Sequence, residues 1–171
     1  MTTIRPATPA DAAELAVLSA ETFSETFTYY PPEDLAAYLA EAYTEEGYTH
    51  EITSSDYGIW VAEQEGSLIG YVVAGSAHLP HPELSEADGE IRRLYVRSNH
   101  QGQGLGSQLL EQALQWLLKD NHQRTLWLGV WSENYGAQRL YQRYGFERVG
   151  DYYFEVGKTR DFEFILRRLP H

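Results

Sequence analysis

Three β-rich runs follow one another between residues 58 and 96 with no helical segment between them. The runs 58–63 and 68–74 are joined across the turn 64–67, which predicts an antiparallel hairpin, and a third strand is expected at 90–96. TIM barrels and doubly wound sheets alternate strands with helices, so this stretch argues against both folds. A mixed sheet with helices packed on it fits the pattern better.

Segments with helical periodicity lie on both sides of this stretch. Thr8 and Asp11 are typical helix-start residues, and Gly145 is a typical helix stop. The expected helices are 8–20, 33–46, 104–119 and 134–144. An initial strand and the runs 125–130, 146–156 and 162–168 supply the remaining strands. We therefore expect an α/β (α+β) fold in a single domain spanning residues 1–171, with a mixed, mostly antiparallel sheet of about six to seven strands flanked by about four helices.

The charge balance restricts the partners of this domain. With 13 Lys and Arg against 25 Asp and Glu, the formal net charge is −12 at pH 7. Such a field repels nucleic acids and anionic membranes and favours cations, so we expect no nucleic acid and no membrane as partners. The absence of cysteine excludes disulfides, thiolate metal sites and cysteine nucleophiles. The first ten residues lack a signal-peptide pattern, and no run approaches about 18 apolar residues, so we expect a cytoplasmic protein.

A glycine cluster, Gln101-Gly-Gln-Gly-Leu-Gly106, stands between an expected strand and an amphipathic helix. Free backbone N–H groups and the helix dipole attract phosphate oxygens at such a point, and glycines let the backbone approach them. No Lys-Ser/Thr pair follows, so the cluster is not a P-loop, and its spacing differs from the Rossmann pattern. Phosphate binding at 101–107 is therefore expected, with a plain tight turn as the alternative.

Two blocks of residues carry a family resemblance. The first is Gln101-x-x-Gly104-x-Gly106, and the second is Asn134-x-x-Ala137-x-x-x-Tyr141-x-x-x-Gly145-Phe146. With the order of strands and helices, they resemble the GCN5-related N-acetyltransferases (GNAT). The segments 21–27, 90–96, 127–131 and 154–157 look most like the bacterial spermidine/spermine acetyltransferases of the PaiA type. The resemblance implies the GNAT fold and acetyl-CoA as co-substrate.

The resemblance also implies a cofactor site. The acceptor amine would attack the thioester directly in a ternary complex, without an acyl-enzyme. A bulge in the strand at Leu94, Tyr95 and Val96 would bind the thioester carbonyl and the pantetheine through its backbone. The residues expected to bind acetyl-CoA are Leu94, Tyr95, Val96, Gln101, Gly102, Gln103, Gly104, Leu105, Gly106, Ser107, Asn134, Ala137 and Tyr141.

Acetyl transfer needs a neutral amine and a proton for the departing thiolate. Tyr141 is expected from its position in the motif to be the proton donor, with packing against the core as the alternative; it lies seven residues after Asn134 and so projects from the same helix face. For Asn134 the alternative interpretation is a helix N-cap, which by itself would explain the residue. Glu90 is the first choice for the general base, directly or through water.

Further acidic and aromatic residues are candidates for the acceptor site. Glu21 and Glu25 are the alternative bases. The expected substrate-binding residues are Glu21, Glu25, Tyr29 and Tyr30. The pair His78-x-x-His81 lies in a loop without a carboxylate at ligand spacing, so no metal site is expected.

The expected function is transfer of an acetyl group to a primary amine of a small cationic molecule, with a polyamine (spermidine or spermine) as the first choice. Alternative acceptors are a protein lysine or N-terminus, or an aminoglycoside-like amine. From another class, the domain would bind acetyl-CoA as a sensor without turnover. The sequence leaves the oligomeric state open, a homodimer included.

Overall fold

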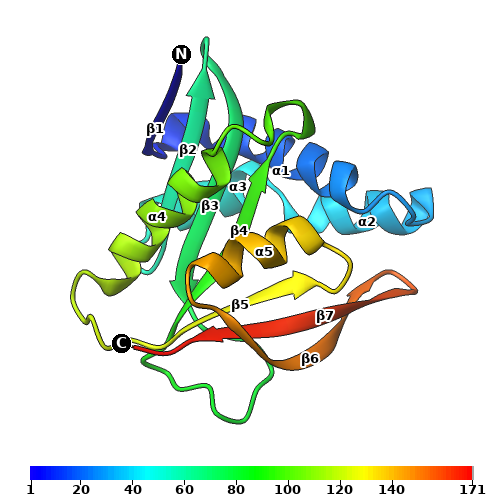
Figure 1. Ribbon diagram of the computed structural model, residues 1–171. Coiled ribbons are helices and arrows are strands. Elements are labelled where there is room, and N and C mark those ends of the chain that lie inside the picture. Colours follow the sequence, from blue (N-terminus) through cyan, green and yellow to red (C-terminus); the bar gives the residue numbers. More distant parts are fainter. Residues whose placement is uncertain (171) are drawn as a thin grey trace.

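The computed structural model describes residues 1–170, and within them seven strands form one sheet in the order β1-β2-β3-β4-β5-β7-β6 (Figure 1). The strands are β1 (Thr2–Pro6), β2 (Gly58–Gln64), β3 (Ser67–Ser76), β4 (Gly89–Val96), β5 (Leu126–Trp131), β6 (Glu147–Val156) and β7 (Thr159–Arg168). Neighbouring strands run antiparallel except β4 and β5, which are parallel. The mixed, mostly antiparallel sheet expected from the sequence is confirmed.

Five α-helices accompany the sheet within the described residues. They are α1 (Ala12–Thr26), α2 (Pro32–Ala42), α3 (Glu45–Thr53), α4 (Leu105–Leu118) and α5 (Tyr135–Arg143), with short 3-10 turns η1 (Pro9–Asp11) and η2 (Ser98–His100). The expected helix 33–46 is in fact two helices. α2 ends at Ala42, and Thr44 starts α3 because its side chain accepts a hydrogen bond from the Gly47 N–H at 3.0 Å. No helix within residues 1–170 combines the length and apolarity needed to cross a bilayer.

The first helix also differs from its expected bounds, 8–20. It begins at Ala12, one turn later, and continues to Thr26. The helix-start residues Thr8 and Asp11 instead form a capping box around η1, in which the Thr8 N–H donates to the Asp11 carboxylate at 2.7 Å.

The two faces of the sheet have separate apolar cores because side chains alternate along each strand. On β3, Val72 packs with α4, whereas its neighbours Tyr71 and Val73 pack with α1 and α3. α4 and α5 therefore cover one face of the sheet, and α1 and α3 cover the other (Figure 1).

α2 lies at the edge of this second face. It packs through Leu35, Tyr38 and Leu39 on an aromatic cluster that includes Phe23 and Phe27 of the first helical region. The α2 residue Asp34 accepts hydrogen bonds from the Lys158 N–H at 3.2 Å and the Thr159 hydroxyl at 3.4 Å. The helix is thereby tied to the turn between β6 and β7.

β4 and β5 part halfway along their length. Their pairing covers Gly89↔Leu126, Glu90↔Trp127 and Ile91↔Leu128, after which β4 continues to Val96 and β5 to Trp131 without pairing to each other. Figure 1 shows the two strands diverging. The parting leaves backbone groups of β4 free on the side that faces β5.

The predicted bulge at Leu94, Tyr95 and Val96 is wrong in position. Against β3 the register shifts between the pairs Val73↔Arg93 and Ala74↔Ile91, which makes Arg92 the extra residue. From Arg93 to Val96 the pairing with β3 is regular. The irregularity therefore lies beside the point where β4 leaves β5, where a local twist helps the strands to separate.

Candidate active site

The parting of β4 and β5 creates three adjoining hollows. The glycine-loop cleft, about 270 Å³, is lined by the end of β4, residues of the loop 100–106 and α5. The aromatic cavity, about 440 Å³, is lined by residues of α1, α2, β4, β6 and β7. The passage is a smaller hollow of about 60 Å³ that shares lining residues with the other two. Tyr95 lines all three hollows, Tyr141 lines the passage and the cleft, and Glu163 lines the passage and the cavity.

The glycine loop has the backbone geometry that close approach of a ligand requires. Gly102 and Gly104 have φ values of +80° and +81°, in the left-handed region that favours glycine, and Gly104 is the N-cap of α4. A Cβ at Gly102 would meet nothing within 4 Å, so the loop faces open space. The first N–H groups of α4 have no partner inside the helix, which makes this end suitable for the phosphates of coenzyme A.

Most of the residues expected to bind the cofactor line this cleft. They are Leu94, Tyr95, Val96, Gln101, Gly102, Gly104, Leu105, Gly106, Asn134, Ala137 and Tyr141. Gln103 and Ser107 do not line it. The Gln101 side chain donates to the Val96 carbonyl at 3.0 Å and so closes the loop onto the end of β4.

α5 supplies the other wall of the cleft. Asn134 is its N-cap, with the side-chain oxygen accepting from the Ala137 N–H at 3.2 Å, as its alternative interpretation predicts. Tyr141 is 6% exposed and lines both the cleft and the passage. Burial raises the pKa of Tyr141 above its ordinary value, so its hydroxyl holds its proton at neutral pH.

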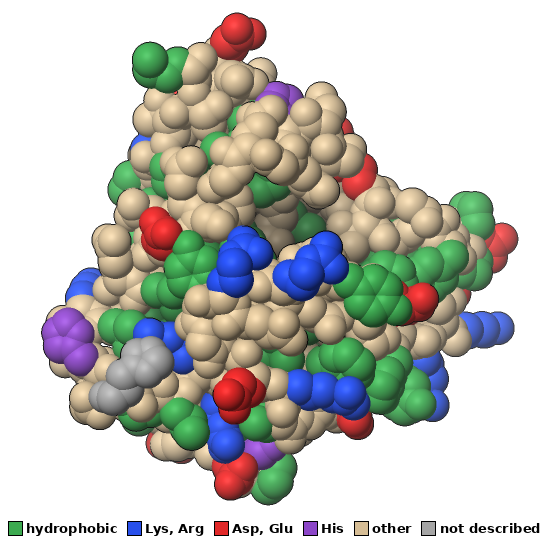
Figure 2. Space-filling model, in the orientation of Figure 1, with side chains coloured by type: hydrophobic (Ala, Val, Ile, Leu, Met, Phe, Trp, Pro, Cys, Tyr) green, Lys and Arg blue, Asp and Glu red, His purple; other side chains and the backbone are tan. Residues whose placement is uncertain are grey.

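Two basic residues of α5 were not anticipated. Figure 2 shows a hollow above α5 in this view, with Lys or Arg side chains on its rim. α5 carries Arg139 and Arg143, both exposed. In a chain with a net charge of −12 they give this face a local positive charge that suits an anionic cofactor.

The aromatic cavity combines ring faces with charged groups. Its walls include Phe23, Phe27, Tyr38, Tyr43, Tyr95, Tyr152 and Phe154, and its charged residues include Glu90, Arg92, Arg93 and Glu163. The Arg93 guanidinium is paired with Glu51 at 2.6 Å, and Arg92 donates to the Ser76 carbonyl at 3.0 Å. Glu51 offsets the charge of Arg93, whereas the partner of Arg92 is a neutral carbonyl, so the aromatic ring faces are the feature of this cavity that attracts a cation.

Glu90 is 2% exposed and lines the aromatic cavity, but it already has two hydrogen-bond donors. Its Oε1 accepts from the His78 backbone N–H at 2.9 Å and lies 2.7 Å from His78 Nδ1. His81 faces elsewhere, with Nε2 3.3 Å from the Val149 carbonyl. Within residues 1–170, no group of three or more His, Cys, Asp or Glu residues could hold a metal ion.

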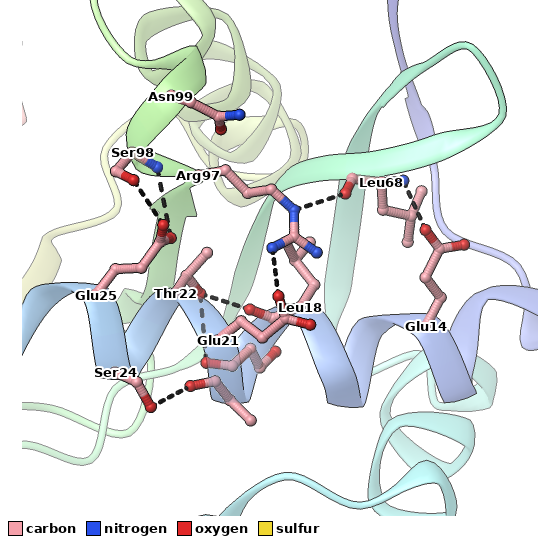
Figure 3. A network of polar contacts seen from close by, with 12 residues as sticks. Glu14, Leu18, Glu21, Thr22, Ser24, Glu25, Leu68, Arg97, Ser98 and Asn99 are labelled. Carbon is pink, nitrogen blue, oxygen red and sulfur yellow. Dashed lines mark hydrogen bonds and ion pairs between the residues drawn. The ribbon is translucent and has the colours of Figure 1, made fainter.

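The structure does not bring Glu21 and Glu25 to the aromatic cavity. The Glu21 carboxylate pairs with Arg97 Nη1 at 2.7 Å, and Glu25 Oε2 accepts from the Ser98 hydroxyl at 2.6 Å. Figure 3 shows both carboxylates pointing from α1 toward the segment that follows β4. They fasten α1 to that segment, which sequence reasoning could not anticipate because Arg97 and Ser98 lie more than 70 residues away.

Tyr29 and Tyr30 lie beside the aromatic cavity and do not line it. The Tyr29 ring is 47% exposed and lies 5.6 Å from the ring of Trp131. Tyr30 is buried against Phe23 and Phe27. Both residues thus support the aromatic wall from behind.

Sequence reasoning missed two buried carboxylates on β7, Asp161 and Glu163. Burial raises the pKa of Glu163 to about 8, with a smaller contribution from the charge of Asp161, whose own pKa burial raises to about 6. The available signal was their alternation with Phe162 and Phe164, which puts both acids on the face of β7 that also carries buried Ile165.

Three kinds of comparison show which proteins this chain is similar to. A model of the acetyltransferase (GNAT) family matches residues 20–146. An uncharacterised N-acetyltransferase of Lactobacillus delbrueckii subsp. lactis is 31% identical over 159 residues, 92% of this chain and 91% of the relative. The spermine/spermidine N(1)-acetyltransferase of Bacillus subtilis is 30% identical over 97 residues, 56% of this chain and 62% of the relative. Among solved structures, the PaiA N-acetyltransferase of Thermoplasma acidophilum in complex with coenzyme A has a TM-score of 0.79 at 21% identity and covers 99% of both chains.

The chain belongs to the acetyltransferase (GNAT) family, and it is an N-acetyltransferase that uses acetyl-CoA. The expected fold class is confirmed at the same time.

Proposed function

We propose that this enzyme transfers the acetyl group of acetyl-CoA to a primary amine of a small polycation, with spermidine and spermine as the first acceptors. The aromatic cavity is the observation that carries the proposal. Ring faces attract ammonium groups, and the buried carboxyl groups of Glu90 and Glu163 offer oxygen atoms that can accept hydrogen bonds from an ammonium in the same cavity. Cavity residues therefore replace Glu21, Glu25, Tyr29 and Tyr30 as our acceptor-binding set.

The relatives support the choice of acceptor class. The Bacillus subtilis relative bears the name spermine/spermidine N(1)-acetyltransferase and is similar over 56% of this chain. The Thermoplasma neighbour bears the name PaiA. The similarity in fold extends over almost the whole chain, including the segments that line the aromatic cavity.

The chain's own groups suit the cofactor. The N-terminus of α4, with Gly102 and Gly104 in front of it, would hold the pyrophosphate. The free backbone edge of β4 at 94–96 would pair with the pantetheine amides, and its N–H groups would stabilise the negative charge that develops on the thioester oxygen. Arg139 and Arg143 would attract the remaining phosphate.

The arrangement favours direct attack in a ternary complex. The amine would approach from the aromatic cavity and the thioester from the glycine-loop cleft, and the two would meet in the passage. Tyr141, which lines the passage, would donate a proton to the departing thiolate. With no cysteine in the chain, no thioester acyl-enzyme can form.

A panel of acceptors tests the proposal. The purified enzyme is incubated with acetyl-CoA and, in parallel, spermidine, spermine, a simple monoamine, a lysine peptide and an alanine N-terminal peptide. Release of coenzyme A and the mass of each product are measured. We expect kcat/KM for the polyamines to exceed that for the peptides by about ten-fold or more, since each ammonium contact is worth about 1 kcal/mol.

Two outcomes would contradict the proposal. Faster transfer to a peptide amine than to either polyamine would make the enzyme a protein acetyltransferase. Binding of acetyl-CoA with no transfer to any amine would favour the sensor interpretation.

A further inference from the structure

Glu163 lies where the aromatic cavity meets the passage. It lines both hollows, whereas Glu90 and His78 line only the aromatic cavity. Tyr141, the proposed proton donor to the thiolate, lines the passage as well. From this placement we infer that the Glu163 carboxylate accepts the proton that the acceptor ammonium must lose before it attacks. The inference rests on the proposed function.

Glu163 is buried, and its surroundings suit a residue that acts in the reaction. The residue is 8% exposed, and its Oε2 is buried with no hydrogen-bond partner within residues 1–170. A buried polar atom without a partner normally destabilises a fold. An ammonium group arriving in the cavity would supply the missing partner, so the site is organised for a bound acceptor.

Other candidate bases are less well placed. The Glu90 Oε1 is already engaged by two donors of His78, and its side chain is absent from the lining of the passage. Glu21 and Glu25 are occupied by Arg97 and Ser98 outside the cavity. Asp161 is buried on the same face of β7 but lines neither hollow.

The proposed step balances. The ammonium R–NH₃⁺ gives one proton to the Glu163 carboxylate, and the nitrogen lone pair forms the N–C bond to the thioester carbonyl. The C–S bond breaks and its electron pair leaves on sulfur, which receives a proton from Tyr141. The nitrogen's second proton returns to the Tyr141 oxygen, and Glu163 releases its proton to solvent. The sum is R–NH₃⁺ and acetyl-CoA giving R–NH–acetyl, coenzyme A and H⁺.

Burial, rather than the charged groups around the cavity, makes the Glu163 carboxyl a stronger base than an ordinary one. The charged or titratable neighbours are His78, Glu90, Arg92 and Arg93 around the cavity and Asp161 on its own strand. The nearby tyrosines are Tyr29, Tyr38, Tyr95 and Tyr152. Burial and the charge of Asp161 raise the pKa of Glu163 to about 8. A base whose pKa lies near the working pH takes up a proton more effectively than one near 4.

The pH dependence of kcat/KM tests the inference, with spermidine as acceptor. We expect the wild-type rate to rise with pH through about 8, as the Glu163 carboxyl ionises. Glu163→Gln should lower the rate at pH 7.5 by about 10²–10⁴-fold, and its rate should keep rising above pH 8 with the fraction of free amine instead of levelling off there. The deficit should shrink toward pH 10, where free amine is present without a base.

Two further variants are matched controls. Glu163→Asp keeps a carboxylate and should keep the rise at a lower rate. Asp161→Asn removes the neighbouring charge on the same strand, so it should retain transfer and move the rise to lower pH. Calorimetry with acetyl-CoA checks that each variant is folded, because neither residue lines the glycine-loop cleft.

The remaining outcomes separate the two hypotheses. A wild-type profile in Glu163→Gln overturns the inference and leaves the proposed function intact. An equal loss of rate at every pH in Glu163→Gln also overturns the inference, because it would indicate a role in acceptor binding alone. Loss of the rise with pH in Asp161→Asn overturns it as well. A wild-type enzyme that acetylates no amine overturns the proposed function and this inference with it.

Discussion

Tyr141 and Tyr144 lie three residues apart at the end of α5 and have different surroundings. Tyr141 is a buried residue that lines the passage, whereas the Tyr144 hydroxyl donates to the Glu111 carboxylate at 2.6 Å on the outside of the domain. The same chemical group is thus available to the reaction in one case and committed to a surface contact in the other.

This contrast provides a matched pair of variants. Tyr141→Phe should lower kcat by about ten-fold or more while the affinity for acetyl-CoA stays nearly constant, because only the proton donor is removed. Tyr144→Phe should leave turnover unchanged and cost at most about 1 kcal/mol of stability. Steady-state kinetics and calorimetry measure both. Unaltered turnover in Tyr141→Phe, with chemistry limiting the rate, would remove Tyr141 from the mechanism.

The buried carboxyl of Glu163 also predicts a pH dependence of stability. Its pKa in the folded chain is about 8, raised from 4.5, so between these values the folded state binds more protons than the unfolded state. The free energy of unfolding therefore falls as pH rises from about 4.5 to 8. Glu163→Gln lacks this contribution, and its Tm at pH 8.5 should exceed that of the wild type by about 5 °C or more.

At pH 4.5 the Tm of Glu163→Gln should exceed that of the wild type by little, because wild-type Glu163 is then protonated in the folded chain. Thermal unfolding at the two pH values measures the difference. A variant with the same Tm as the wild type at pH 8.5 would show that the carboxyl is not desolvated.

At the scale of elements, a second glycine with positive φ makes it possible to test the ligand-binding role of Gly104 separately from backbone strain. Gly104 precedes α4 with φ +81°, and Gly66, in the turn between β2 and β3, has the same φ with nothing within 4 Å of its side-chain position. A glutamate strains the backbone at either site, by about 1–2 kcal/mol. Only at Gly104 does it also put bulk and negative charge in front of the helix N-terminus.

Gly104→Glu should therefore abolish detectable binding of acetyl-CoA, while Gly66→Glu should bind it with wild-type affinity despite a similar loss of stability. Calorimetric titration of the two folded variants makes the comparison. If Gly104→Glu binds acetyl-CoA normally, the phosphate site lies elsewhere.

At the scale of the whole molecule, the net charge of −12 should influence the rate at which the acceptor arrives. A negative field raises the association rate of a polycation, and salt screens it, since the Debye length falls from about 30 Å at 0.01 M to about 8 Å at 0.15 M. For spermidine, kcat/KM should fall steeply over this range, and for a monoamine of similar length it should fall less. Equal salt dependence for the two amines would contradict electrostatic steering.

Much of the fold follows from local sequence. The strand and helix periodicities, the glycine cluster and the capping residues act over a few neighbouring positions, so the sheet, α4 and α5 were predictable. The break between α2 and α3 was not, because Tyr43 continues the apolar pattern of 33–46 although the helix ends before it. The glycine-loop cleft was largely predictable for the same local reason, since most of its residues come from the end of β4, the loop that follows it and α5.

The acceptor side was decided only by tertiary structure. Glu163 is one of 25 acidic residues, and its alternation with Phe162 and Phe164 indicates only which face of β7 it shares with Asp161. Glu163 becomes distinctive because β7 pairs with β5. This pairing places Glu163 in the lining of the passage, next to the point where β5 and β4 separate. The same kind of long-range contact, with Arg97 and Ser98, holds Glu21 and Glu25 outside the aromatic cavity. The sequence by itself indicated a phosphate site at the start of α4, because backbone chemistry at a helix end is local, and the two motif blocks carried the resemblance that implied acetyl-CoA. Which side chains face the acceptor depended on strand order and on burial, and these arise only when distant segments pack together.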